Sequence, residues 1–128
     1  MAGIVIRDAH FPGRAPIDAY GNGGFRFAGM SHRGSILCIP SGIYGWAPRA
    51  LTEVDAAALE KVLAEAAEID VLLLGVGASA AAMPAALRSV LQAARITADA
   101  MTTGAAARTF NVLLAEDRRV AAALIAVD

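Results

Sequence analysis

The chain has 128 residues, 57% hydrophobic and 18% charged, which is enough for one well-buried core, so we expect a single domain over 1–128. Its formal net charge is −1 and the charges are interspersed, so it lacks the basic stripe that nucleic-acid binding requires. Its apolar runs stay below the roughly 18 residues that span a bilayer, and charges occur within the first ten residues, so we expect neither a membrane span nor a signal peptide.

The first third of the chain is predicted to be β-rich. Residues 3–7 suit a strand, and 17–20 and 25–27 suit two arms of a hairpin around the glycine-rich turn 21–24. A second turn is predicted over 31–34. It leads into an interior strand over 35–40, and an aromatic loop or short strand follows over 42–46. The only tryptophan, Trp46, lies there, and its simplest role is to close one end of the core.

From residue 52 the hydrophobic period changes from 2 to 3.6, which predicts alternating helices and strands. Thr52 suits an N-cap for a helix over 53–67. The apolar run 69–75 predicts a strand buried on both faces at the centre of the sheet. A second helix over 84–94 starts at Pro84. A strand over 96–101, a third helix over 104–115 with Val112 and Leu113 inward, and a last strand over 120–127 complete the chain.

Two helical crossovers predict that the strands 35–40, 69–75 and 96–101 are parallel. Spacing alone leaves the direction of the last strand open. Leu72, with six other leucines, is expected to surround one core; the six are Leu63, Leu74, Leu87, Leu91, Leu113 and Leu124.

Several familiar catalytic patterns are incomplete in this sequence. Gly75-Val76-Gly77 begins like a dinucleotide fingerprint, but Ala80 stands at the third glycine position. His10 and His32 lack ligand partners at metal-binding spacing, so we expect no metal site and no cofactor. The single cysteine, Cys38, lies in an apolar run and cannot form an internal disulfide, so we expect a cytoplasmic protein.

The stretch 101–111 is the best candidate for binding. A strand end passes through Thr102, Thr103 and Gly104 into a helix, which leaves free backbone N–H groups at the edge where Gly75 and Gly77 are expected. Two interpretations remain open for the polar groups: they grip an anion or carboxylate, or they cap the helix and fasten loops. The segments expected to line one cleft contribute these candidate residues: Ser41, Trp46, Gly75, Gly77, Thr102, Thr103, Gly104, Arg108 and Asn111.

Six stretches together resemble a domain-of-unknown-function family, the Mth938-like domains. They are Ile17-Asp18-Ala19-Tyr20-Gly21, 24–27, 34–37, 74–77, Pro84 and 103–113. Eukaryotic members of that family include an assembly factor for mitochondrial respiratory complex I and a protein associated with adipogenesis. The resemblance implies an α/β fold, a three-layer β+α/β/α domain with a mixed central sheet, an N-terminal β-hairpin layer and a last strand antiparallel to the others. Phe110 stands where the family more often has Tyr, and Arg95 where we expect Gly.

Two hypotheses about function follow. The first is a non-catalytic binding or assembly module whose partner is another protein of a respiratory or membrane complex, as the resemblance implies. The second is a binding protein or an enzyme that takes a small molecule or anion at the carboxyl edge of the sheet. The absence of paired acid and base residues favours the first hypothesis.

Overall fold

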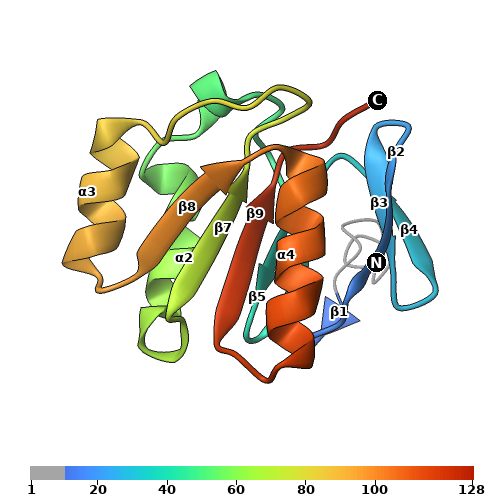
Figure 1. Cartoon of the computed structure of the whole chain (residues 1–128), viewed down its shortest axis with the longest axis horizontal. Helices are drawn as coiled ribbons and strands as arrows, with labels where there is room; N and C mark the ends of the chain where they lie inside the picture. The colour runs from blue at the N-terminus through green and yellow to red at the C-terminus, as the bar shows by residue number, and fades with distance from the viewer. Residues whose placement is uncertain (1–10) are drawn as a thin grey trace, which may run out of the picture.

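The large sheet is the middle of three layers, with helices on one face and a helix beside the small sheet on the other (Figure 1). The computed structural model describes residues 11–128, so the strand predicted over 3–7 and His10 lie outside the described residues. Figure 1 shows α2 and α3 on one face of the large sheet, and α4 with the small sheet on the other. The predicted α/β class with a β+α/β/α order is therefore confirmed.

The elements have these bounds. The strands are β1 Phe11–Pro12, β2 Ile17–Gly21, β3 Gly24–Phe27, β4 Met30–Arg33, β5 Ser35–Ile39, β6 Gly42–Trp46, β7 Val71–Gly75, β8 Thr97–Met101 and β9 Val120–Leu124. The helices are α2 Glu60–Ala64, α3 Ala85–Ala93 and α4 Thr103–Ala115, with the 3₁₀ turns η1 Leu51–Glu53, η2 Ala57–Leu59 and η3 Ala66–Glu68. No helix within residues 11–128 has the length and apolar character that crossing a membrane requires.

The small sheet is an antiparallel meander in the order β2-β3-β4. Asn22 and Gly23 join β2 to β3 with φ values of 53° and 78°, as a tight hairpin turn requires, so the predicted hairpin is confirmed. The turn predicted over 31–34 is wrong, because residues 31–33 belong to β4 and the turn between β3 and β4 is made by Ala28 and Gly29, at φ 51° and 76°. Only Gly34, at φ 102°, lies outside the strands, between β4 and β5. Alanine seldom adopts positive φ, so Ala28 does not mark a turn in the sequence, although Gly29 beside it favours one.

The large sheet has the order β1-β6-β5-β9-β7-β8. The predicted parallel pairing of 69–75 with 96–101 is confirmed as β7 and β8. The expectation that 35–40 runs parallel to them is wrong, because β6 forms a hairpin with β5 and the crossover to β7 leaves from β6. The last strand, β9, is parallel to β7 and antiparallel to β5, so the direction implied by the resemblance is also wrong.

The strand over 69–75 is not the centre of the sheet. β7 lies next to the edge strand β8, and the middle positions belong to β5 and β9. The central position of β9 was hard to predict, because its alanines 121–123 are completely buried although alanine has a low strand propensity. Ala122 faces α4, whose Ala106 and Ala107 point inward, so small side chains on both elements allow this helix to pack closely on the sheet, while Ala121 and Ala123 face α2 and α3.

The helix predicted over 53–67 is broken into η1, η2, the five-residue helix α2 and η3. Thr52 lies inside η1 and does not cap a helix, whereas the Asp55 carboxylate accepts a hydrogen bond from the Ala58 N–H at 2.9 Å. The indole Nε1 of Trp46 donates to the Ala58 carbonyl at 2.8 Å. In a regular α-helix the Ala58 carbonyl would accept a hydrogen bond from the Val62 N–H, and here it accepts one from the Trp46 indole.

Two hydrophobic cores lie on opposite faces of the large sheet, so the single core that we expected is wrong. Leu72 and Leu74 point toward α2 and α3, where Leu63, Leu87 and Leu91 also pack. Leu73 of β7 points the other way, toward α4 and the small sheet. The second core includes Leu124 and is closed by the partly buried Leu113. Val112 is 56% exposed, so the expectation that it faces inward is also wrong.

Helix α3 begins one residue later than predicted, because Pro84 is its N-cap with an extended backbone. After the helix, Arg95 adopts φ 62°, a left-handed conformation. The Ile96 N–H reaches back to the Leu91 carbonyl at 2.9 Å, which closes the helix end. Glycine suits this position best, which explains why Gly was expected there.

Candidate functional site

The carboxyl ends of β6, β7, β8 and β9 meet at one edge of the large sheet. This follows from the pairing of Gly75 with Met101 and Leu124, and from the direction of β6. Ser41 lies in the turn at the opposite end of β6, where its amide and hydroxyl both bond to the Glu65 carboxylate. The structure thus separates Ser41 from the residues at this edge, and it places Trp46 on the opposite face of the sheet from α4, so the predicted residues do not line one cleft.

Thr103 fastens this edge together from inside. Its hydroxyl donates to the Ile125 carbonyl at 2.7 Å and accepts the Gly77 N–H at 3.1 Å, and its side chain is fully buried. Gly77 has φ 118°, so it makes a turn that other residues rarely adopt. A Cβ on Gly75 would lie 3.0 Å from the Thr103 Cα and 2.9 Å from Leu124, so the close contact requires glycine. These three predicted site residues shape the junction of β7, α4 and β9.

The remaining predicted residues of α4 also bond within the protein. Thr102 caps the helix by accepting the Ala105 N–H at 3.3 Å. The Tyr20 ring covers Gly104, where a Cβ would overlap the phenol, and the Arg108 guanidinium donates to the Tyr20 hydroxyl at 3.4 Å.

Asn111 grips β2 with both ends of its side-chain amide. Its Oδ1 accepts the Ile17 N–H and its Nδ2 donates to the Ile17 carbonyl, each at 2.8 Å. These bonds match the interpretation in which the polar residues of α4 fasten neighbouring segments. The anion site at this edge stays a prediction.

Trp46 lies on the other face of the sheet from α4 and lines a groove beside the broken helical segment. The groove has a volume of about 580 Å³. Its floor is apolar, because Leu37, Trp46 and Pro48 contribute buried side chains. We call it the Trp46 groove; its lining residues are Leu37, Gly45, Trp46, Ala47, Pro48, Glu53, Asp55, Ala57, Ala58, Glu60 and Lys61.

The rim of the Trp46 groove is acidic. Glu53, Asp55 and Glu60 are exposed there, against the single cation Lys61. The Lys61 ammonium lies 4.8 Å from the centre of the Tyr44 ring and makes a cation–π interaction with it. Glu53 and Asp55 each use one oxygen to bond a backbone N–H of their own segment. The groove therefore combines an apolar floor with a net negative edge.

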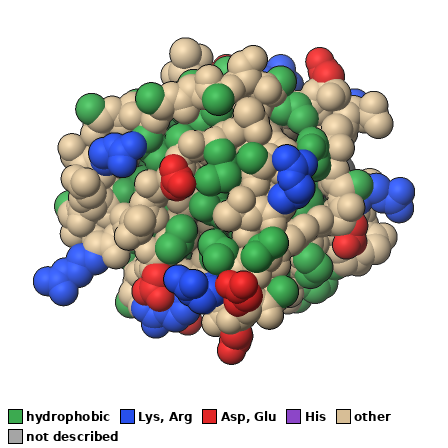
Figure 2. Space-filling view, in the orientation of Figure 1, with side chains coloured by type: hydrophobic (Ala, Val, Ile, Leu, Met, Phe, Trp, Pro, Cys, Tyr) green, Lys and Arg blue, Asp and Glu red, His purple; other side chains and the backbone are tan. Residues whose placement is uncertain are grey.

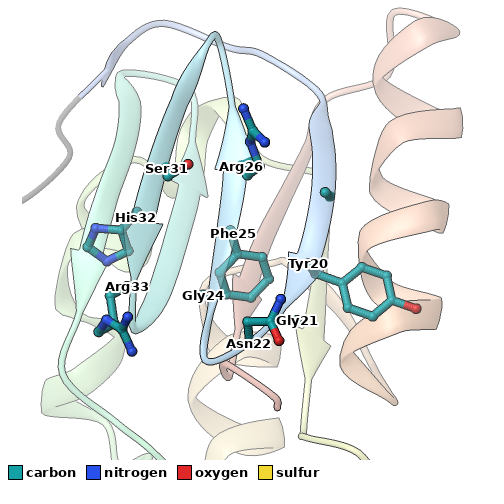
Figure 3. Close-up of a pocket in the computed structure, with 10 residues that line it drawn as sticks. Tyr20, Gly21, Asn22, Gly24, Phe25, Arg26, Ser31, His32 and Arg33 are labelled. Atoms are coloured by element: carbon teal, nitrogen blue, oxygen red, sulfur yellow. The ribbon is translucent and has the colours of Figure 1, made fainter.

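A second hollow lies on the outer face of the small sheet. It has a volume of about 440 Å³ and is lined by β2, β3, β4 and the turn at Asn22. Figure 3 shows Arg26 beside Ser31 on neighbouring strands, and Arg33 farther along, at the level of Asn22. We call it the arginine hollow. Sequence reasoning missed it, because β4 was expected to be a turn and the alternation that exposes Ser31 and Arg33 together was not recognised.

Metal-binding and thiol chemistry find little support among the side chains of residues 11–128. No group of three or more His, Cys, Asp or Glu side chains in this part of the chain is placed to hold a metal ion. Burial raises the pKa of the Cys38 thiol, because the charged thiolate would lose its hydration inside the core.

The face of the molecule in Figure 2 carries both acidic and basic side chains, which lie among apolar ones.

Comparison with known proteins places the chain among proteins whose function is not established. Residues 17–125 match the family described as "Protein of unknown function (DUF498/DUF598)". An uncharacterised protein of Rhodobacter capsulatus is 43% identical over 119 residues, which cover 93% of this chain and 90% of the relative.

Solved structures support the same fold. A Bartonella henselae structure described as an outer membrane protein matches with a TM-score of 0.90 and 60% identity, over 93% of this chain and 100% of that one. A Bordetella pertussis protein described as a Mth938-like domain matches with a TM-score of 0.75 and 27% identity, over 86% of this chain and 84% of that one. The expected Mth938-like fold is thereby confirmed.

Proposed function

This chain belongs to the DUF498/DUF598 family of proteins of unknown function, and we propose that it is a non-catalytic binding or assembly module that holds a segment of another protein in the Trp46 groove. The observation that carries the proposal is the groove itself, with its apolar floor and its acidic rim of Glu53, Asp55 and Glu60. A matching segment has an apolar side chain that fills the groove and flanking Lys or Arg residues that pair with the rim.

The polar residues predicted for the candidate site support a binding role over a catalytic one. Thr103, Thr102 and Asn111 all bond to backbone groups of the protein, so those bonds would have to break before these side chains could act on a substrate. The cysteine is buried and its thiol is held neutral, which disfavours nucleophilic chemistry.

The resemblance to a respiratory complex I assembly factor motivates the class of partner. We propose that the partner is a protein of a respiratory or membrane complex and that the chain meets it from the cytoplasm. Arginine and lysine often flank the cytoplasmic ends of membrane segments, so such proteins carry basic segments of the kind that the groove would accept.

The test is capture of partners from native lysate with matched charge variants. Glu60→Lys reverses a charge on the groove rim, and Glu68→Lys makes the same change on η3, outside the groove. The proposal predicts a partner that the wild type and Glu68→Lys retain and that Glu60→Lys loses, with weaker retention at high salt. Equal capture of every protein by the two variants would overturn it.

Purified partner then permits a direct measurement. Trp46 is the only tryptophan and its ring lines the groove, so its fluorescence reports on what enters. Binding in the groove is expected to change the intensity or wavelength of its emission in a saturable way. Binding that leaves the emission unchanged would place the partner elsewhere on the molecule.

A further inference from the structure

The arginine hollow has the charge and shape of a binding site for an acidic chain. Its lining residues include two arginines and no aspartate or glutamate, although the whole chain has a net charge of −1. Both Arg26 and Arg33 are exposed, so their guanidinium groups remain hydrated and available. Local positive charge on a slightly negative protein attracts anionic partners to this face.

Neither arginine is neutralised by a described neighbour. The only ion pair within residues 11–128 joins Arg119 to Asp70, and neither residue belongs to the small sheet. Asp18 shares a smaller hollow of about 260 Å³ with Arg26, but no ion pair forms between them. The five N–H donors of each guanidinium therefore remain for a carboxylate or phosphate, which Arg binds in a bidentate manner.

The strand pairing fixes how the two charges are spaced. Arg26 pairs with Ser31, and Gly24 pairs with Arg33, so the arginines stand on rungs two residues apart on one face. Figure 3 shows them at two levels of the hollow, with Gly24 of β3 beside Arg33. A Cβ on Gly24 would overlap the His32 carbonyl, so the two strands lie in close contact there. Because the two arginines also lie on neighbouring strands, their Cα atoms are separated by roughly 6.6 Å along the strands and roughly 4.8 Å across them, about 8 Å in all. Alternate side chains of an extended peptide are roughly 6.6 Å apart, a difference that the long arginine side chains can span.

We propose that the arginine hollow binds an extended acidic segment of a partner protein, with carboxylates on alternate residues that meet Arg26 and Arg33. The Ser31 hydroxyl lies beside the first carboxylate and adds a neutral donor. This site is separate from the Trp46 groove, since it is formed by the small sheet, and it selects the opposite charge. One molecule could then hold an acidic and a basic segment at the same time.

The test uses a fluorescently labelled peptide of alternating Asp and Val, followed by fluorescence polarisation at low salt. The double variant Arg26→Gln with Arg33→Gln is expected to bind about tenfold more weakly or worse, because it loses both charge-assisted contacts. The control is Arg88→Gln with Arg95→Gln, which removes the same charge from another shallow hollow. The control is expected to bind like the wild type.

Three results would overturn the proposal. An equal loss in both double variants would show general attraction to positive charge, and the absence of saturable binding by wild type would show no site. Binding of inorganic pyrophosphate that depends on Arg26 and Arg33, without binding of the peptide, would assign the hollow to a small anion. Amide chemical-shift changes on peptide addition that are confined to residues 19–33 would support it, and changes centred elsewhere would not.

Discussion

Leu72→Ala tests the packing of β7 between the two layers of helices. Leu72 is 0% exposed and belongs to the core under α2 and α3. Its neighbours across the sheet are Ala98 on β8 and Ala121 on β9, which are too small to fill the space that a lost isobutyl group leaves. When the cavity cannot collapse, the destabilisation is in the upper part of the range for Leu→Ala substitutions. We therefore expect the free energy of unfolding to fall by about 4 kcal/mol.

The assay is equilibrium unfolding in urea. At a slope of about 2 kcal/mol per molar, the expected loss moves the midpoint down by about 2 M without changing the slope. The control is Val112→Ala on the exposed side of α4, which is expected to change the stability by less than about 0.5 kcal/mol. A midpoint shift for Leu72→Ala no larger than that of the control would refute the account of the core.

Three further substitutions test separate contacts. Thr103→Val should lower the free energy of unfolding by about 1–3 kcal/mol, because it leaves the Gly77 N–H and the Ile125 carbonyl without their partner, and hydrogen exchange at Gly77 should become faster. Asn111→Ala should weaken the attachment of β2 to α4 and speed exchange at its N–H partner, while exchange in α3 stays unchanged as the internal control. Arg95→Gly should raise the thermal midpoint, because glycine adopts the left-handed conformation at lower cost; an unchanged or lower midpoint would show that arginine is not strained there.

The fold could be predicted where one local pattern decides the structure. The run over 69–75 needs burial on both faces, and Asn22 with Gly23 suits a tight turn, so both were found from the sequence. The direction of β5 could not be found that way, because it depends on whether 42–46 pairs as a strand, which only its contacts with β1 and β5 decide. The break in the helix after residue 50 likewise depends on a contact between elements, because the Trp46 indole of β6 donates a hydrogen bond to the Ala58 carbonyl.

The candidate site was predicted less well than the fold. The residues at the start of α4 do gather at the carboxyl edge, as the strand directions require, but their side chains are engaged in holding it together. The two hollows are formed by residues from several strands and turns, and their lining has no local sequence pattern. Trp46 is the exception, since a lone tryptophan at a strand end was already a candidate.

Site-specific photo-cross-linking tests the central claim most directly. A photoreactive amino acid at position 57 lies in the Trp46 groove, and one at position 93 lies at the exposed end of α3 as the control. Irradiation in cells that express the chain is expected to join a discrete partner to position 57 and not to position 93, and Glu60→Lys should abolish that product. The same products from both positions, or a position-57 product that Glu60→Lys leaves unchanged, would contradict the account.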